Sequence, residues 1–82
     1  MDLTEIKVSV LIEAQGRSWQ AASEIQEGMD YTNEPWLYTD TPAALSELVK
    51  EGHMRVWGDL YKITQSGSDH IDGVMERARA NS

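Results

Sequence analysis

The stretch from Pro42 to Gly67 constrains the fold of this chain more than any other part. Pro42 suits the first position of a helix, where its missing N–H costs nothing, and Thr41 before it is a suitable N-cap. The apolar residues that follow recur at helical spacing and share one face: they are Ala44, Leu45, Leu48 and Val49. Gly52 is typical of the left-handed residue that ends a helix. We therefore expect a short amphipathic helix that starts at Pro42 and stops at Gly52.

The apolar spacing changes to two after this glycine, as in a β-hairpin. A two-residue turn at Gly58-Asp59 fixes the register, because glycine takes the positive-φ first position of such a turn. The facing pairs are then Met54/Ile63, Arg55/Lys62, Val56/Tyr61 and Trp57/Leu60. The first and third pairs are apolar and are expected to face inward, while the other two pairs face outward. The predicted core lies where helix, hairpin and last helix meet, and its members are Leu48, Val56, Tyr61, Ile63 and Ile71.

The residues before this stretch are expected to form two helices. Residues 2–15 fit two patterns: apolar residues alternate from Ile6 to Ile12 as in a strand, but they also form one helical stripe. The length of the segment up to a predicted stop at Gly16 favours the helix. Ser18 can cap a second helix that turns Trp19, Ala22 and Ile25 inward and stops at Gly28.

Residues 29–40 are expected to form a long connection, because Asn33 and Pro35 interrupt regular structure. The segment also holds apolar residues that are unsuited to a loop wholly in water: Tyr31, Trp36, Leu37 and Tyr38. Two interpretations remain open. Trp36 and Leu37 either fold back over the core or belong to a loop that binds a partner.

A last helix is predicted after the hairpin, with Ser68 as its cap. Its apolar face consists of Ile71, Val74, Met75 and Ala78, and Gly73 weakens the helix by about 1 kcal/mol relative to alanine. Small domains often gain stability by pairing. We therefore expect a homodimer whose contact includes Met75 and Ala78, together with Leu3 and Ile6 of the first helix.

The composition limits the class of protein. A chain of 82 residues predicts one domain, residues 1–82, near the lower end of what a single core stabilises. Without cysteine there are no disulfides or thiolate metal sites, and an intracellular, cytoplasmic protein is expected. No apolar run is long enough to cross a membrane. Because 14 acidic residues stand against 7 Lys and Arg, a net charge of −7, diffuse affinity for nucleic acid is not expected.

The predicted order of three helices, a hairpin and a fourth helix resembles a winged helix-turn-helix domain. Residues 42–71 are similar to small transcriptional regulators of the MarR and PadR type, in which two spaced leucines and a glycine end the third helix. A tyrosine-hydrophobic-threonine strand end and a further glycine then follow. The matching residues are Leu45, Leu48, Gly52, Tyr61, Ile63, Thr64 and Gly67. The chain departs from the pattern in its short wing and in the length of residues 29–40.

The resemblance implies binding of double-stranded DNA, with the third helix in the major groove and the wing along a phosphate backbone. Among the outward residues of that helix, Ser46 and Glu47 could contact a base edge and Lys50 a phosphate, while Ala43 offers only a methyl group. The outer face of the hairpin adds two cations and an exposed apolar tip, and Arg17 could extend this patch. The predicted DNA-binding residues are Arg17, Ser46, Lys50, Arg55, Trp57 and Lys62.

The acidic middle of the chain favours a different partner. From Gln20 to Val49 there is no Lys or Arg, but there are six acids: Glu24, Glu27, Asp30, Glu34, Asp40 and Glu47. Such a surface suits a basic protein, so a protein-interaction module is the alternative. Its predicted contact residues are Glu24, Glu27, Trp36, Glu47, Trp57 and Leu60. Adaptation of a DNA-binding domain to high salt is a third explanation of the acidic excess.

Catalysis and cofactor binding are not expected. His53 and His70 have no neighbouring ligand at metal-site spacing and are predicted to be surface histidines. The sequence has no nucleophile elbow and no glycine-rich phosphate loop.

Overall fold

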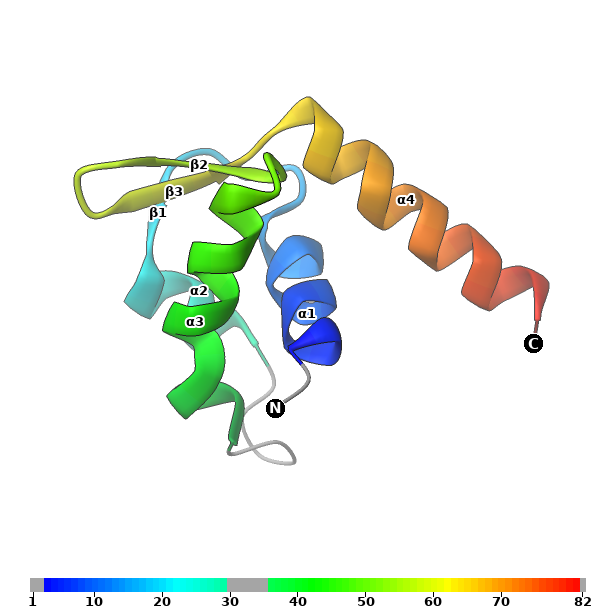
Figure 1. Cartoon of the computed structure of the whole chain (residues 1–82), viewed down its shortest axis with the longest axis horizontal. Helices are drawn as coiled ribbons and strands as arrows, with labels where there is room; N and C mark the ends of the chain where they lie inside the picture. The colour runs from blue at the N-terminus through cyan, green and yellow to red at the C-terminus, as the bar shows by residue number, and fades with distance from the viewer. Residues whose placement is uncertain (1–2, 30–35, 82) are drawn as a thin grey trace.

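A computed structural model describes residues 3–29 and 36–81, without the side chains of residues 36–39. In chain order the elements are α1 (Thr4–Ala14), β1 (Gln20–Ala21), α2 (Ala22–Gly28), α3 (Trp36–Lys50), β2 (Met54–Trp57), β3 (Leu60–Ile63) and α4 (Gln65–Ala80). The described part of the chain is therefore mainly helical, with a small antiparallel sheet of strand order β1-β3-β2. Figure 1 shows α1, α2 and α3 grouped below the hairpin, and α4 extending away from them.

The first element, α1, is a helix, so the strand pattern was misleading. Its buried residues are Ile6, Val10, Leu11 and Ala14, which lie on one helical face, whereas Ile12 is half exposed. The helix ends where Gly16 takes a φ of 77°. This left-handed conformation is open to glycine at little steric cost.

The segment after α1 differs from the prediction. Ser18 does not cap a helix; instead Gln20 and Ala21 form β1, which pairs with Tyr61 and Leu60 of β3. The predicted two-stranded hairpin is thus part of a three-stranded sheet. The second helix, α2, starts only at Ala22, where the Glu24 side chain accepts a hydrogen bond from the Ala21 N–H at 3.1 Å. Ile25 of α2 is buried as expected.

The third helix is longer than predicted. It begins at Trp36, so Pro42 lies inside α3 and Thr41 is fully buried within the helix rather than acting as its cap. Because proline lacks an N–H, α3 lacks the main-chain hydrogen bond that residue 42 would otherwise donate. The connection predicted for residues 29–40 is therefore shorter, because residues 36–40 belong to α3. Asn33 and Pro35 lie outside the described residues, and so do the side chains of Trp36 and Leu37 on which the two interpretations of that segment depend.

The end of α3 follows the prediction closely. Gly52 has a φ of 81° and its N–H bonds to the Val49 carbonyl at 3.1 Å. The His53 N–H bonds to the Leu48 carbonyl at 2.9 Å. These two bonds form a Schellman motif, which satisfies carbonyls that a helix end leaves unpaired. The motif fixes the direction in which the chain leaves α3 and enters β2.

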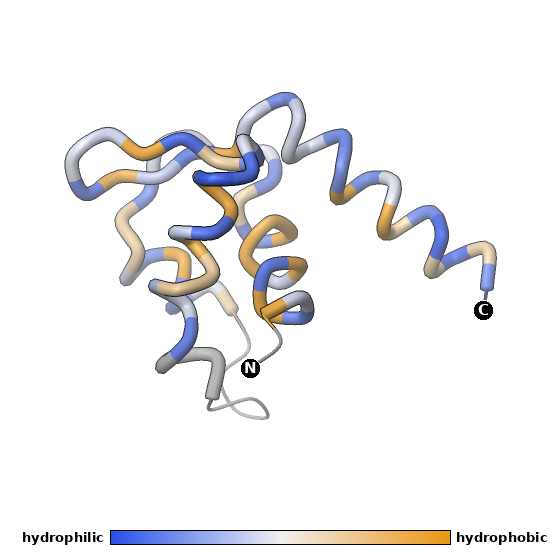
Figure 2. The backbone as a smooth tube through the Cα atoms, in the orientation of Figure 1, coloured by the Kyte–Doolittle hydropathy of each residue, from blue (hydrophilic) through white to orange (hydrophobic). Residues whose placement is uncertain are grey.

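The core lies between α1, α2, α3 and the hairpin base. Figure 2 shows hydrophobic positions concentrated in α1 and in the second half of α3, while the last turns of α4 are largely hydrophilic. The buried apolar residues are Ile6, Val10, Leu11, Ala14, Ile25, Met29, Ala44, Leu45, Leu48, Met54 and Ile71. Tyr61 and Ile63 are half-buried against this core. Val56 was predicted to be buried but is 46% exposed, because it lies toward the hairpin tip, past the buried end of β2 at Met54.

The fourth helix docks through its first half only. It starts at Gln65, not after Ser68, and Thr64 is its N-cap, since the Thr64 side chain accepts from the Gly67 N–H. Gly67 and Ile71 are buried, whereas Met75 and Ala78 are exposed on the half that extends away in Figure 1. No helix among the described residues is long and apolar enough to cross a membrane.

We predict that Leu48→Ala lowers the free energy of unfolding by about 2–5 kcal/mol, because Leu48 is buried at the centre of the α3 face and the substitution leaves a cavity. Urea unfolding followed by circular dichroism measures this change. The exposed Ser46→Ala, two residues away on α3, is the control and should change stability by less than about 0.5 kcal/mol. An unchanged midpoint for Leu48→Ala would contradict the packing of α3.

Candidate functional site

The exposed face of α3 holds the residues that were predicted to point outward. Ala43, Ser46, Glu47 and Lys50 are all exposed. Lys50 lies in the last turn of α3, where a cation also interacts favourably with the helix dipole. Ser46 and Glu47 are one turn away, and each could accept a hydrogen bond from a base edge. This face therefore has a single cation and few groups that distinguish one base from another.

The outer face of the hairpin carries two further cations. The predicted register is confirmed in all four pairs, so Arg55 lies directly opposite Lys62. Both side chains are exposed, and within the described part of the chain neither forms an ion pair with an acidic side chain. Like charges directly opposite each other are mildly destabilising in a sheet. An anionic group between Arg55 and Lys62 would relieve this repulsion.

Trp57 lies beside these cations at the hairpin tip. Its side chain is 71% exposed, and its ring centroid is 6.0 Å from that of Trp19 in an edge-to-face arrangement of 64°. Trp19 immediately precedes β1, which the prediction had placed in a helix. A two-residue strand shows no periodicity, so the sequence contained no signal that would join Trp19 to the hairpin. Leu60, opposite Trp57, is half-buried.

Arg17 lies just before β1 and pairs with an acid of α1. It is exposed, and its guanidinium lies 3.4 Å from the Glu13 carboxylate one helical turn earlier. β1 pairs Gln20 with Tyr61 and Ala21 with Leu60, so the residues before Gln20 lie toward the Ile63 end of β3. Arg17 is thus displaced from the turn at Gly58, and its predicted contact with DNA stays a prediction.

The acidic residues that were predicted to contact a protein partner differ in their surroundings. Glu24 accepts the hydrogen bond at the start of α2, so it has a local structural function. Glu27 and Glu47 are exposed and carry no ion pair within the described ranges. Asp40 is half-buried in α3. Asp30, Glu34 and the Trp36 side chain lie outside what the structure describes.

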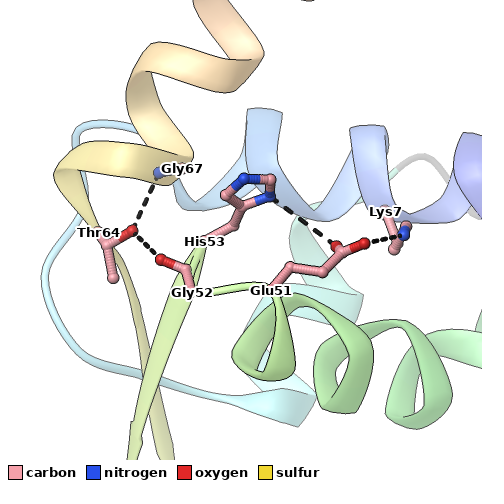
Figure 3. A network of polar contacts seen from close by, with 6 residues as sticks. All are labelled: Lys7, Glu51, Gly52, His53, Thr64 and Gly67. Carbon is pink, nitrogen blue, oxygen red and sulfur yellow. Dashed lines mark hydrogen bonds and ion pairs between the residues drawn. The ribbon is translucent and has the colours of Figure 1, made fainter.

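The two histidines, far apart in sequence, are stacked in space. Their ring centroids are 4.5 Å apart, with 17° between the planes, beside a pocket of about 220 Å³ between α1, the end of α3 and α4. Figure 3 shows Glu51 between Lys7, at 2.9 Å, and Nδ1 of His53, at 3.9 Å. His70 is exposed and His53 half-buried, so only the former is the surface histidine that was predicted. No cluster of three or more metal-ligating side chains occurs in residues 3–29 and 36–81.

The hairpin base is fixed by Thr64, as Figure 3 shows. The Thr64 hydroxyl donates to the Gly52 carbonyl at 2.7 Å and accepts from the Gly67 N–H at 3.0 Å. The Thr64 N–H in turn donates to the His53 carbonyl at 3.0 Å. This one residue thus ties the end of β3 to the end of α3 and to the start of α4. It holds the hairpin, and with it Arg55, Trp57 and Lys62, in a fixed position relative to α3.

Comparison with known proteins gives no relative from which a site could be transferred. No family model matches the chain, and neither a curated protein nor a solved structure matches it.

The junction at Gly67 gives a testable pair of substitutions. We predict that Gly67→Ala lowers the free energy of unfolding by about 1–3 kcal/mol, because a methyl group there would clash with the His53 carbonyl and with Ile63. Gly73→Ala, in the same helix, has only Arg77 at 3.6 Å nearby and should raise stability by about 1 kcal/mol. Urea unfolding of both variants measures the effects. Equal stabilisation by the two alanines would show that α4 does not approach His53 closely.

Proposed function

We propose that this chain is a winged helix-turn-helix domain that binds double-stranded DNA in transcriptional control. In this proposal α3 enters the major groove and the β2–β3 hairpin, as the wing, follows a phosphate backbone. The arrangement of three helices before a hairpin and a fourth after it supports this proposal, as does the resemblance of residues 42–71 to small MarR- and PadR-type regulators.

The distribution of free cations is the observation that carries the proposal. Lys7 and Arg17 are paired with acids on the helical body. Lys50, Arg55 and Lys62 form no ion pair with the described residues, and they lie at the end of α3 and on the hairpin. These are the two elements that would meet phosphates. Three of the cations without an ion pair in the described chain thus lie where DNA would bind, although Arg77 of α4 is also unpaired and the net charge is −7.

The same residues define what kind of binding to expect. The α3 face lacks the Arg, Asn or Gln side chains that make bidentate base contacts, so most of the affinity would come from phosphates. Long-range repulsion between DNA and the acidic body is screened beyond about 10 Å at 0.1 M salt. Direct contacts from Lys50, Arg55 and Lys62 are shorter than this distance and would persist.

We predict that Lys50→Ala, Arg55→Ala and Lys62→Ala each weaken binding to a mixed-sequence duplex. Each lost phosphate contact should reduce the slope of log affinity against log salt by about 0.9. Fluorescence anisotropy across a salt series measures the slope. Arg77→Ala is the matched control, since Arg77 is an exposed cation of α4 without an ion pair among the described residues, and it should leave the slope unchanged. No duplex binding at about 50 mM salt would refute the proposal.

A protein-interaction module is the second candidate, favoured by Glu27 and Glu47, which stay exposed and unpaired in the described chain. In that case a basic partner would contact α2 and α3. Charge reversal at Glu27 or Glu47 would then slow association, because exposed charges at an interface act mainly on the association rate. Lys50→Ala would have little effect, the opposite of its effect on DNA binding.

We also propose that two copies pair through α4. Met75 and Ala78 remain exposed on the half of this helix that extends from the body, which supports the proposal. Ile6 is 2% exposed and Leu3 packs against the core, so the predicted contribution of these two residues to the contact is withdrawn. The proposed contact is thus confined to the distal part of α4.

For this pairing we predict a particle of twice the chain mass of 9.2 kDa in static light scattering. Met75→Glu should return the mass to that of one chain, because it places a charge in the apolar contact. Glu76→Gln, at the exposed neighbouring position, is the control and should stay dimeric. A mass of 9.2 kDa at every accessible concentration would exclude the dimer.

A further inference from the structure

We propose that the outer face of the sheet binds single-stranded DNA, with Trp57 stacking on an unpaired base while Arg55 and Lys62 contact the adjacent phosphates. The proposal shares these two cations with the proposed function and rests on it to that extent. It adds the stacking of an unpaired base on Trp57, next to Trp19, beyond the phosphate contacts proposed for a duplex.

The position of Trp57 is the first reason. A tryptophan buries about 150–250 Å² when it packs into a core, and this gain favours burial of an aromatic ring. Trp57 instead leaves 71% of its side chain in solvent. Its ring is nevertheless in contact with Trp19, at 6.0 Å and 64°. This contact restrains the ring without covering it, so less side-chain freedom is lost when a planar ligand stacks on it.

The second reason is that the cations share a face with the ring. Side chains two residues apart in a strand project from the same side of a sheet, so Arg55 lies on the same side as Trp57. The register puts Lys62 opposite Arg55 and Leu60 opposite Trp57, on that same side. No acid occurs within β2 or β3, and Asp59 lies in the turn. The face therefore presents one aromatic ring beside two cations, complementary to a base and its phosphates.

A single strand fits this face better than a duplex or an acidic peptide. In a duplex the base faces are covered by their neighbours, whereas an unpaired base can stack on an aromatic side chain. An acidic peptide would satisfy Arg55 and Lys62 but would gain nothing specific from the exposed ring of Trp57.

Titration of the full chain with fluorescently labelled oligothymidylate, followed by anisotropy, tests the proposal. Trp57→Ala should weaken binding by about 5- to 150-fold, the usual effect of losing one base-stacking residue. Trp57→Phe should retain most of the affinity, but Trp57→Leu, which is apolar without a π face, should behave like alanine. Ile12→Ala removes an exposed apolar side chain from α1, outside both proposed contacts, and should have no effect. Arg55→Ala and Lys62→Ala should each lower the salt slope by about 0.7.

The results separate this inference from the proposed function. Binding of duplex without binding of oligothymidylate would overturn the inference and leave the proposed function intact. Binding of oligothymidylate without duplex would support the inference and overturn duplex binding. Full affinity in Trp57→Leu, or equal competition by polyglutamate, would show that charge alone acts and would overturn the stacking role.

Discussion

The backbone junction between the end of α3 and the start of α4 is the constraint on which the rest of the structure depends. The His53 carbonyl accepts the Thr64 N–H and lies so close to Gly67 that no side chain fits there. Thr64 joins the same point through its hydroxyl, which bridges Gly52 and Gly67. Because the two strands of the hairpin leave from this junction, it sets their position against α3. It also sets the direction of α4, which is why one half of that helix docks and the other extends away.

The distribution of charge gives the fixed hairpin its chemical character. On the helical body, some charged side chains pair or serve as caps, as in Lys7 with Glu51 and Glu24 at the start of α2, while Glu27 and Glu47 are exposed without an ion pair in the described residues. On the hairpin, Arg55 and Lys62 face each other without an acid, although like charges so placed destabilise the sheet. An arrangement that costs stability in the isolated chain suggests a role in binding. If the proposed DNA binding occurs, the net charge of −7 would limit it to short-range contacts, because the acidic body repels a polyanion.

The sequence predicted those parts of the fold that depend on local geometry. The hairpin register followed from one glycine turn, and the end of α3 followed from Gly52, since both require a positive φ.

Other features depend on tertiary contacts that leave no local pattern. β1 has only two residues and exists through its pairing with β3, so neither it nor the contact of Trp19 with Trp57 could be foreseen. Pro42 is typical of a helix start, yet α3 runs through it. Val56 is exposed because the buried part of the sheet ends before it. The alternation of apolar and polar residues along a strand does not reveal where that burial ends.

The two apolar surfaces proposed as contacts, the hairpin tip and the distal half of α4, lie at opposite ends of the described part of the chain. Figure 1 shows the hairpin tip at one end of the long axis and the distal half of α4 at the other. Trp57 is the last residue of β2, next to the hairpin turn. The buried core lies between them, and its residues from α1 and α3 contribute to neither surface. Pairing through Met75 and Ala78 would therefore leave Arg55, Trp57 and Lys62 free to bind a ligand. A dimer of this kind would present two hairpins, and its affinity for a nucleic acid that reaches both would exceed that of one copy without any new contact.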